Sequence, residues 1–400
     1  MNRSEKRNPE RKDICYIAAD VVIPSPTGSS VHTMELASNF AARGLEVHVV
    51  CRRAGRREPP AEVISGFKVH RLYRFIIAPG RRRDTSAGSG SKKRAGIVNR
   101  IYYWYLLTIF RIYVGIKSAL LISRFDIDLI IERETSFGAG GLASLLTGRP
   151  LILEIIGPRY SRFSAMRSKK ILYYTESMLR SWVDRTKTIP VSAGVNLNLF
   201  KKDSNGRAAM RERLGVGPEG VLVGYIGTFQ IWHGVDTIIA CLKLLQDDFP
   251  GVKFLFVGPG FDSFKSLAEK LDVAHLCIFT GPVKYDDVPL YINACDVLLA
   301  PYNPSADSMR QKFGVGFPLK VLEYMACGVP VVSTRIQPVD LIIKHKETGI
   351  LIEPGDAEQL ADAIKYLIQN PGEAERLSEN GRALVQNNYS WDKIASLFLS

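Results

Sequence analysis

The stretch from Gly314 to Thr334, GVGFPLKVLEYMACGVPVVST, carries the residues best suited to chemistry. Pro318 is typical of the first position of a helix, and Gly328 fits the left-handed position after its end. Lys320 and Glu323 are three positions apart and share a face of this expected helix. A cation at a helix start suits a phosphate, and a carboxylate one turn further suits a sugar hydroxyl. An amphipathic helix with an i, i+3 ion pair explains the same spacing without any function.

Two other loops join a strand to a helix through small residues. In YIGTFQIWHGVDTIIA (225–240), Gly227 ends a strand and His233 lies in the loop before the next helix. In PSPTGSSVHTMEL (24–36), Gly28 and Ser29 belong to a small-residue loop at a helix N-terminus, which suits a phosphate or a carbonyl. A packed loop histidine and an ordinary small-residue turn explain these loops equally well when each is taken alone.

The elements that must position these loops alternate between strands and helices, which predicts α/β domains with doubly wound parallel sheets. The expected strands are 14–19, 46–50, 128–131, 151–156, 221–225, 252–257, 276–279, 297–300, 330–333 and 349–352. The expected helices are 31–43, 100–125, 138–146, 235–245, 264–271, 288–294, 318–327 and 357–368.

The length of 400 residues suggests two or three domains, and a polar, glycine-bearing stretch near 190–205 marks a boundary. We expect a first domain at 1–195, with a flexible basic loop at 79–99. A second domain is expected at 196–375. Residues 376–400 are expected to form a C-terminal helix that packs back toward the first domain.

Charge is distributed unevenly. Residues 1–190 hold 33 Lys and Arg against 16 Asp and Glu, a net charge of +17, whereas residues 191–400 carry −4. An anionic partner is therefore expected for the first half only: a nucleic acid, an anionic membrane face or a phosphorylated substrate. Binding to nucleic acid would explain the charge alone, but no aromatic–basic readout motif is visible.

Composition excludes several classes of protein. Hydrophobic residues make up 46% and charged residues 23%, as in ordinary globular chains. The run at 101–110 is half of the roughly 20 residues that a transmembrane helix needs, and residues 1–13 lack the apolar core of a secretory signal. The six cysteines form no C-x-x-C pair, which favours free thiols in a reducing, cytoplasmic compartment.

Read in order, these motifs resemble the retaining glycosyltransferases of family 4 (group 1), which have the GT-B fold of two Rossmann-like domains facing across a cleft. The resemblance spans about residues 13–395. After the first Gly-rich loop come GVN with Phe200, GTFQIWHGVD, FVGPG, FTG, ACDVLLAP, PLKVLEYMACGVPVV, TGILIEPGD and YSW. The WHG loop and the PLKVLEY helix resemble one subgroup of that family.

The resemblance implies a nucleotide-sugar donor, bound mainly by the second domain. It implies catalytic roles for Lys320, Glu323 and His233, with Glu323 hydrogen-bonded to the donor ribose. The residues implied in donor binding come from four places. They are Gly227 and Thr228 in the loop of 225–240, Pro282 and Val283 against the base, Gly316, Phe317, Pro318 and Leu319 facing the diphosphate, and Gly28 and Ser29 from the first domain.

The chain departs from the common family pattern in four places. Val315 stands where a first carboxylate is frequent, and Thr228 and His233 stand where many relatives have Arg and Lys. Ile156 takes the place of a first-domain His, and Ser192 runs almost directly into Gly194. A relative that binds nucleotide sugars without efficient transfer therefore remains the alternative to an active enzyme.

The resemblance further implies transfer with retention, in which the departing diphosphate deprotonates the acceptor and no cofactor or metal is required. The D-x-D at Asp126–Asp128 precedes a strand, so capping is the preferred interpretation of these two residues. A glycan or lipid-linked acceptor is expected on the first domain (1–195), with no residue assigned to it. The basic loop and the helix at 100–125 are candidates for docking on the anionic inner face of the cell membrane, against the alternative of a solvated loop beside a core helix.

Overall fold

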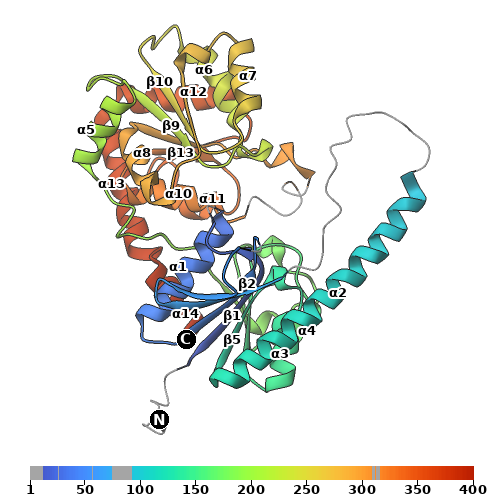
Figure 1. Ribbon diagram of the computed structural model, residues 1–400. Coiled ribbons are helices and arrows are strands. Elements are labelled where there is room, and N and C mark those ends of the chain that lie inside the picture. The colour runs from blue at the N-terminus through green and yellow to red at the C-terminus, as the bar shows by residue number, and fades with distance from the viewer. Residues whose placement is uncertain (1–11, 26, 56, 74–91, 309–310, 312–315) are drawn as a thin grey trace. The chain divides into compact units, whose positions relative to one another are not determined.

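The computed structural model describes residues 12–25, 27–55, 57–73, 92–308, 311 and 316–400, with side chains in helix α2 given for 105, 106 and 108–125 (Figure 1). The chain divides into two compact units, Met1–Val191 and Ser192–Ser400. Each unit is an α/β layer structure around its own sheet, so the expected doubly wound fold is confirmed.

The first unit is built on an eight-stranded sheet. The strands run in the order β3 (Ala61–Ile64), β4 (Phe67–Leu72), β2 (Val47–Arg52), β1 (Ile14–Val22), β5 (Leu129–Arg133), β6 (Leu151–Ile155), β7 (Lys170–Tyr173) and β8 (Thr188–Pro190). Adjacent strands are parallel except for β3 and β4. The helices are α1 (Gly28–Ala42), α2 (Lys92–Phe125), α3 (Ala139–Thr147) and α4 (Arg162–Arg167).

Alternation along β1 assigns its side chains to two different helical layers. Cys15, Ile17 and Ala19 pack in one core with Val114 of α2 and Ala143 of α3. The intervening side chains face the opposite layer, where α1 covers the sheet. Arg133 of β5 and Glu154 of β6 are register partners and lie buried in that second layer, where His32 of α1 pairs with Glu154 (2.6 Å).

The second unit has a six-stranded, fully parallel sheet. Its order is β11 (Cys277–Gly281), β10 (Lys253–Val257), β9 (Leu222–Ile226), β12 (Val297–Ala300), β13 (Val331–Thr334) and β14 (Ile350–Ile352). The helices are α5 (Ser204–Arg213), α6 (Val235–Leu245), α7 (Asp262–Lys270), α8 (Val288–Ala294), α10 (Leu319–Ala326), α11 (Val339–Ile342), α12 (Ala357–Gln369), α13 (Pro371–Asn388) and α14 (Trp391–Leu399).

Two apolar cores lie on the two faces of this second sheet. One joins the strands to α6, α7 and α12, and the other joins them to α5, α8, α10 and α11. Val297 and Leu299 of β12 belong to the first core, whereas Leu298 and Ala300 belong to the second. Burial on both faces explains why these strands read as continuous apolar runs in the sequence.

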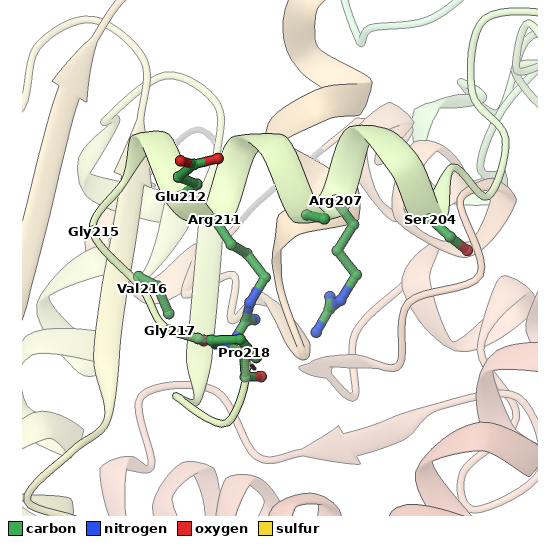
Figure 2. A pocket seen from close by; sticks show the side chains of 9 residues that line it. Ser204, Arg207, Arg211, Glu212, Gly215, Val216, Gly217 and Pro218 are labelled. Atoms are coloured by element: carbon green, nitrogen blue, oxygen red, sulfur yellow. Dashed lines mark hydrogen bonds between the residues drawn. The ribbon is translucent and has the colours of Figure 1, made fainter.

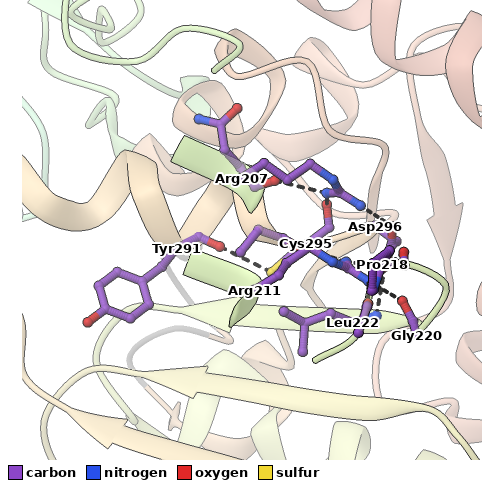
Figure 3. A network of polar contacts seen from close by, with 11 residues as sticks. Arg207, Arg211, Pro218, Gly220, Leu222, Tyr291, Cys295 and Asp296 are labelled. Carbon is purple, nitrogen blue, oxygen red and sulfur yellow. Dashed lines mark hydrogen bonds and ion pairs between the residues drawn. The ribbon is translucent and has the colours of Figure 1, made fainter. Parts of the chain in front are cut away.

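An arginine clamp holds the amino ends of the second unit's central strands together. Arg211 of α5 donates to the carbonyl oxygen of Ala294 (3.0 Å) and pairs with Asp296 (3.1 Å), which also accepts from the Leu222 N–H (2.7 Å) (Figure 3). Arg207, one turn earlier, also pairs with Asp296. Both arginines of this clamp help to line a pocket along α5 (Figure 2). It lies at the opposite end of the strands from the loops that the sequence singles out, so we assign it no part in donor binding.

One expectation for the first unit needs correction, and a second gains a further contact. Helix α2 begins at Lys92, inside the stretch predicted as a flexible loop at 79–99, while residues 79–91 lie outside the described residues. The absence of acidic residues and of proline across 92–125 is compatible with one continuous helix. Asp126 and Asp128 are both paired with Arg149 (2.6 and 3.3 Å), so an ion-pair network accounts for the D-x-D in addition to capping.

Candidate donor site

The strand order of the second sheet reverses between β9 and β12, where ligands bind in open α/β sheets. The loops at this carboxyl edge are tied to one another by backbone hydrogen bonds. Gly227 N–H donates to Val257 (2.9 Å), and Gly258 N–H donates to Gly281 (2.9 Å). Gly258 has φ 137°, and a Cβ at this position would lie 2.0 Å from the Gly227 carbonyl oxygen. Only glycine allows this approach.

Lys320 points at the first of these loops. Helix α10 begins at Leu319 with Pro318 as its cap, one residue later than predicted, which leaves Lys320 in the first turn. Its Nζ donates to the Tyr225 hydroxyl (2.9 Å) and lies 4.3 Å from the centre of that ring. A Cβ on Gly227 would lie 2.7 Å from the same Nζ. The cation thus lies against the glycine that ends β9.

Burial lowers the pKa of Lys320 to about 7, and the charge of Glu323 partly opposes this shift. An anion bound beside Nζ would favour the charged amine. The helix start around Lys320 therefore has the properties of a diphosphate site whose charge responds to its occupant.

His233 is buried and faces the backbone of its own loop. Its Nδ1 is 2.5 Å from the Thr228 carbonyl oxygen and 3.0 Å from the Tyr225 hydroxyl, which itself donates to Thr228 (2.6 Å). The neighbouring Trp232 stacks on Tyr302. His233 therefore holds the Gly227–Thr228 loop in place, and any contact of the ring with an anion has to be made through Nε2.

Glu323 lies one turn after Lys320, and its Oε1 accepts a hydrogen bond from the Tyr285 hydroxyl (2.8 Å). Tyr285 begins the short 3₁₀ turn that follows Pro282 and Val283, the pair expected against the base. Pro282 is exposed and Val283 packs on the adjacent core. The sequence analysis missed Tyr285, whose only signal is its position three residues after Pro282.

The second unit thus gathers most of the expected donor residues on the loops after β9 and β11 and at the start of α10. Gly316 has φ 76°, and Phe317 and Leu319 are partly buried beside Lys320. Gly314 and Val315 lie outside the described residues. Gly28 and Ser29 belong to the first unit, at the start of α1, and their contact with a donor stays a prediction.

Two family models match the chain. "Glycosyltransferase Family 4" matches residues 26–194, and "Glycosyl transferases group 1" matches residues 206–384. A D-inositol 3-phosphate glycosyltransferase of Actinosynnema mirum is 24% identical over 362 residues, which cover 84% of this chain and 82% of the relative. A GDP-mannose-dependent alpha-(1-6)-phosphatidylinositol monomannoside mannosyltransferase of Mycobacterium tuberculosis is 26% identical over 51% of this chain and 52% of its own.

Solved structures share the fold over nearly the whole chain. Sucrose-phosphate synthase from Thermosynechococcus elongatus superposes with a TM-score of 0.71 at 20% identity, covering 97% of each chain. Anabaena Alr3699/HepE in complex with UDP gives 0.71 at 17% identity, covering 96% of this chain and 98% of its own. No helix within the described ranges combines the length and the hydropathy that a membrane span requires.

Proposed function

Because the chain belongs to the glycosyltransferases of family 4 and group 1, we propose that it transfers a sugar with retention of anomeric configuration from a nucleotide-diphosphate sugar to a glycan or lipid-linked acceptor. The observation that carries this proposal is the position of Lys320 Nζ against Gly227 at the reversal point of the second sheet. Relatives named for GDP-mannose and for inositol acceptors support the substrate classes.

Lys320 and the first turn of α10 stabilise the negative charge that grows on the departing diphosphate, and this lowers the barrier to transfer. Glu323, held by Tyr285, accepts hydrogen bonds from the donor ribose. The departing diphosphate takes the proton of the acceptor hydroxyl as the new glycosidic bond forms. We propose that these steps need no metal ion.

The test is a transfer assay with UDP-, GDP- and ADP-hexoses, preceded by a thermal-shift screen that identifies the donor. Release of nucleotide diphosphate together with a product of the donor's anomeric configuration, read by NMR, is the expected result. An inverted product would overturn retention. Donor binding without transfer or hydrolysis, across lipid and glycan acceptors, would favour the alternative of a relative that only binds nucleotide sugars.

We also propose that helix α2 docks on an anionic membrane surface, as a lipid-linked acceptor requires. Between residues 105 and 120 the helix presents exposed apolar side chains three or four positions apart. Seven Lys and Arg and no Asp or Glu lie in its sequence, so its charge complements anionic lipid. The exposed apolar residues are Tyr105, Ile109, Ile112, Ile116 and Leu120.

Cosedimentation with phosphatidylglycerol vesicles, compared with phosphatidylcholine vesicles, tests this docking. Leu120→Ser is expected to weaken binding to the anionic vesicles. Leu341→Ser is the matched control, because Leu341 of the second unit is 63% exposed, as Leu120 is 61% exposed. Equal effects of the two substitutions, or binding indifferent to lipid charge, would remove α2 as the docking surface.

A further inference from the structure

The Tyr225 hydroxyl lies at the meeting point of three parts of the candidate donor site. Tyr225 belongs to β9, two residues before Gly227, and is 1% exposed. Its hydroxyl accepts from Lys320 Nζ at the start of α10 (2.9 Å) and donates to the Thr228 carbonyl oxygen (2.6 Å). It also lies 3.0 Å from Nδ1 of His233, the last residue of a short 3₁₀ turn. One buried side chain thus joins a helix start, a glycine loop and a turn.

The chemistry of these partners fixes where the protons lie. The Thr228 carbonyl oxygen only accepts, so His233 Nδ1, 2.5 Å away, carries a proton that points at it. A charged lysine only donates, so the Tyr225 hydroxyl has to accept from Lys320. The single hydroxyl proton then remains for Thr228. While Lys320 is charged, these bonds have one direction, and the Thr228 carbonyl accepts from two side chains.

A neutral Lys320 would loosen this arrangement. An uncharged amine has a lone pair, so the hydroxyl proton of Tyr225 can turn away from Thr228 toward Nζ. Thr228 then keeps only the bond from His233 among these partners. Burial lowers the pKa of Lys320 to about 7, so both forms of the amine occur near neutral pH. The charge on Lys320 therefore affects how firmly the loop after Gly227 is held.

The other groups around Nζ favour the charged amine. The centres of the Tyr225 and Tyr302 rings lie 4.3 and 5.5 Å from Nζ, and aromatic ring faces attract cations. The carboxylate of Glu323 acts in the same direction from one turn further along α10. His233 is linked to Lys320 through the Tyr225 hydroxyl. The hydroxyl has a further effect, because it fixes the position of the cation relative to the glycine loop.

We propose that Tyr225 is a positioning residue of the donor site, whose hydroxyl holds Lys320 Nζ against the Gly227–Thr228 loop so that the cation and the loop bind a diphosphate as one unit. The identity of the bound group, a diphosphate, rests on the proposed function. An anion beside Nζ keeps the amine charged, which directs the Tyr225 proton to Thr228 and firms the loop. Tyr225 acts through Lys320 and Thr228 and needs no contact with the substrate.

The first test is an NMR titration of Lys320 in the full chain without any ligand, using protein labelled with ¹³C,¹⁵N-lysine. The signal that disappears in Lys320→Arg identifies the residue. Tyr225→Phe keeps the aromatic ring, which packs on Phe229 (centroids 5.3 Å apart), and removes only the hydroxyl. In this variant Lys320 should titrate about half a pH unit or more below its value in the wild type, because a hydrogen bond that favours the charged form is lost.

Tyr302→Phe is the matched control. Tyr302 is 3% exposed and its ring also faces Lys320, but Nζ donates its hydrogen bond to Tyr225. The titration of Lys320 should stay close to that of the wild type in this variant. Unchanged titration in Tyr225→Phe, or equal shifts in Tyr225→Phe and Tyr302→Phe, would overturn the proposal.

The second test measures binding of inorganic pyrophosphate to the full chain by calorimetry at pH 7. Tyr225→Phe should weaken binding about tenfold, and Tyr302→Phe should retain it. Wild-type affinity in Tyr225→Phe would show that the hydroxyl does not help to form the anion site, and would overturn the proposal. Failure of the wild type to bind pyrophosphate would contradict both the diphosphate site of the proposed function and the ligand named here.

The two tests separate this proposal from the proposed function. The titration requires no donor and no turnover, so its result is independent of the transfer assay. Successful transfer with an unshifted titration in Tyr225→Phe would leave the enzyme assignment intact and remove the role of Tyr225. Once the donor is known, Tyr225→Phe should raise the donor KM and lower kcat together. Normal values of both constants, with only a lower melting temperature, would reduce Tyr225 to a packing residue.

Discussion

The two sheets place charged side chains at the same topological point but differ in how those charges are balanced. In the second unit, Lys320 lies against Gly227, and the carboxylate of Glu323 one turn away favours the charged form of the lysine. In the first unit, Arg133 is buried among Glu154, Asp20 and Glu134. The reversal point predicts where a ligand binds, and the local balance of charge predicts what kind of ligand.

The cations also respond differently to burial. A lysine can lose its proton, and burial lowers the pKa of Lys320 to about 7, so an anionic ligand restores its charge. An arginine keeps its charge, and the acidic neighbours of Arg133 raise its pKa further. The charge of Lys320 can therefore vary with pH and with a bound anion, whereas the charge of Arg133 is fixed.

The largest effect is expected at Glu323. Glu323→Gln should reduce kcat/KM at least about 100-fold, because each hydrogen bond to a charged acceptor contributes about 1.5–3 kcal/mol. The melting temperature should stay close to that of the wild type. Tyr285→Phe removes only the hydroxyl that orients Glu323, so its loss should be smaller, about tenfold. Wild-type turnover in Glu323→Gln would remove this carboxylate from the donor site.

Lys320→Ala should raise the donor KM and also lower kcat, for a combined loss of about 10- to 100-fold in kcat/KM. The cation contacts the diphosphate in the ground state, and the charge it stabilises grows as the glycosidic bond breaks. Steady-state kinetics measures both constants. The control is Lys243→Ala, because Lys243 is an exposed residue of α6. Normal kinetics with a slightly lower melting temperature would leave Lys320 only a helix-stabilising role, worth about 0.2–0.5 kcal/mol.

The pH profile sharpens the contrast between lysine and arginine. In the proposed function the charged form of Lys320 binds the diphosphate. Burial lowers the pKa of Lys320 to about 7 in the free protein, so kcat/KM should fall as pH rises through that value. The fall should approach about tenfold per pH unit above it. Lys320→Arg keeps its charge throughout and should flatten this limb, even if its activity is lower. A limb that persists in Lys320→Arg would assign the titration to another group.

Sequence patterns predict the bounds of apolar elements best where glycine, proline or aspartate lies beside them, whatever their length. Helices α6 and α8 and strand β12 have the predicted bounds residue for residue. The loops after β9 and before α10 also lie where the sequence places them, because glycines and a charged helix start mark them; their contact with a donor stays a prediction. The family assignment that they carried is confirmed.

Features set by pairing between distant segments were missed. Strands β3, β7 and β8 have three or four residues each, and neighbouring strands determine their bounds. The contact of Tyr285 with Glu323 joins two loops 38 residues apart. The environment of Arg133 depends on its register with Glu154, which no local pattern specifies. The run IIERE (130–134) has one usable signal: consecutive charged residues at the end of a buried strand.

The remaining prediction concerns stability rather than turnover, and it compares Glu132 with Glu134, two buried carboxyl groups on either side of Arg133. The pKa of Glu134 is raised to about 8 in the folded protein, against about 4.3 in an unfolded chain. Protonation therefore favours the folded state. The stability contributed by this group is fully present below about pH 4.3 and is lost progressively as pH rises toward 8.

Glu134→Gln cannot ionise, so its melting temperature should exceed that of the wild type by an amount that grows between pH 5 and 8. The limit is about 1.4 kcal/mol per pH unit, and for a unit of this size each kcal/mol corresponds to roughly 2–4 °C. Glu132→Gln should be destabilising by about 1–3 kcal/mol, because it replaces an acceptor of the Gly138 N–H or the Gly141 N–H by a donor. Scanning calorimetry across this pH range measures both. A Glu134→Gln protein that is less stable than wild type at pH 8 would show that the Glu134 carboxylate is satisfied within the fold.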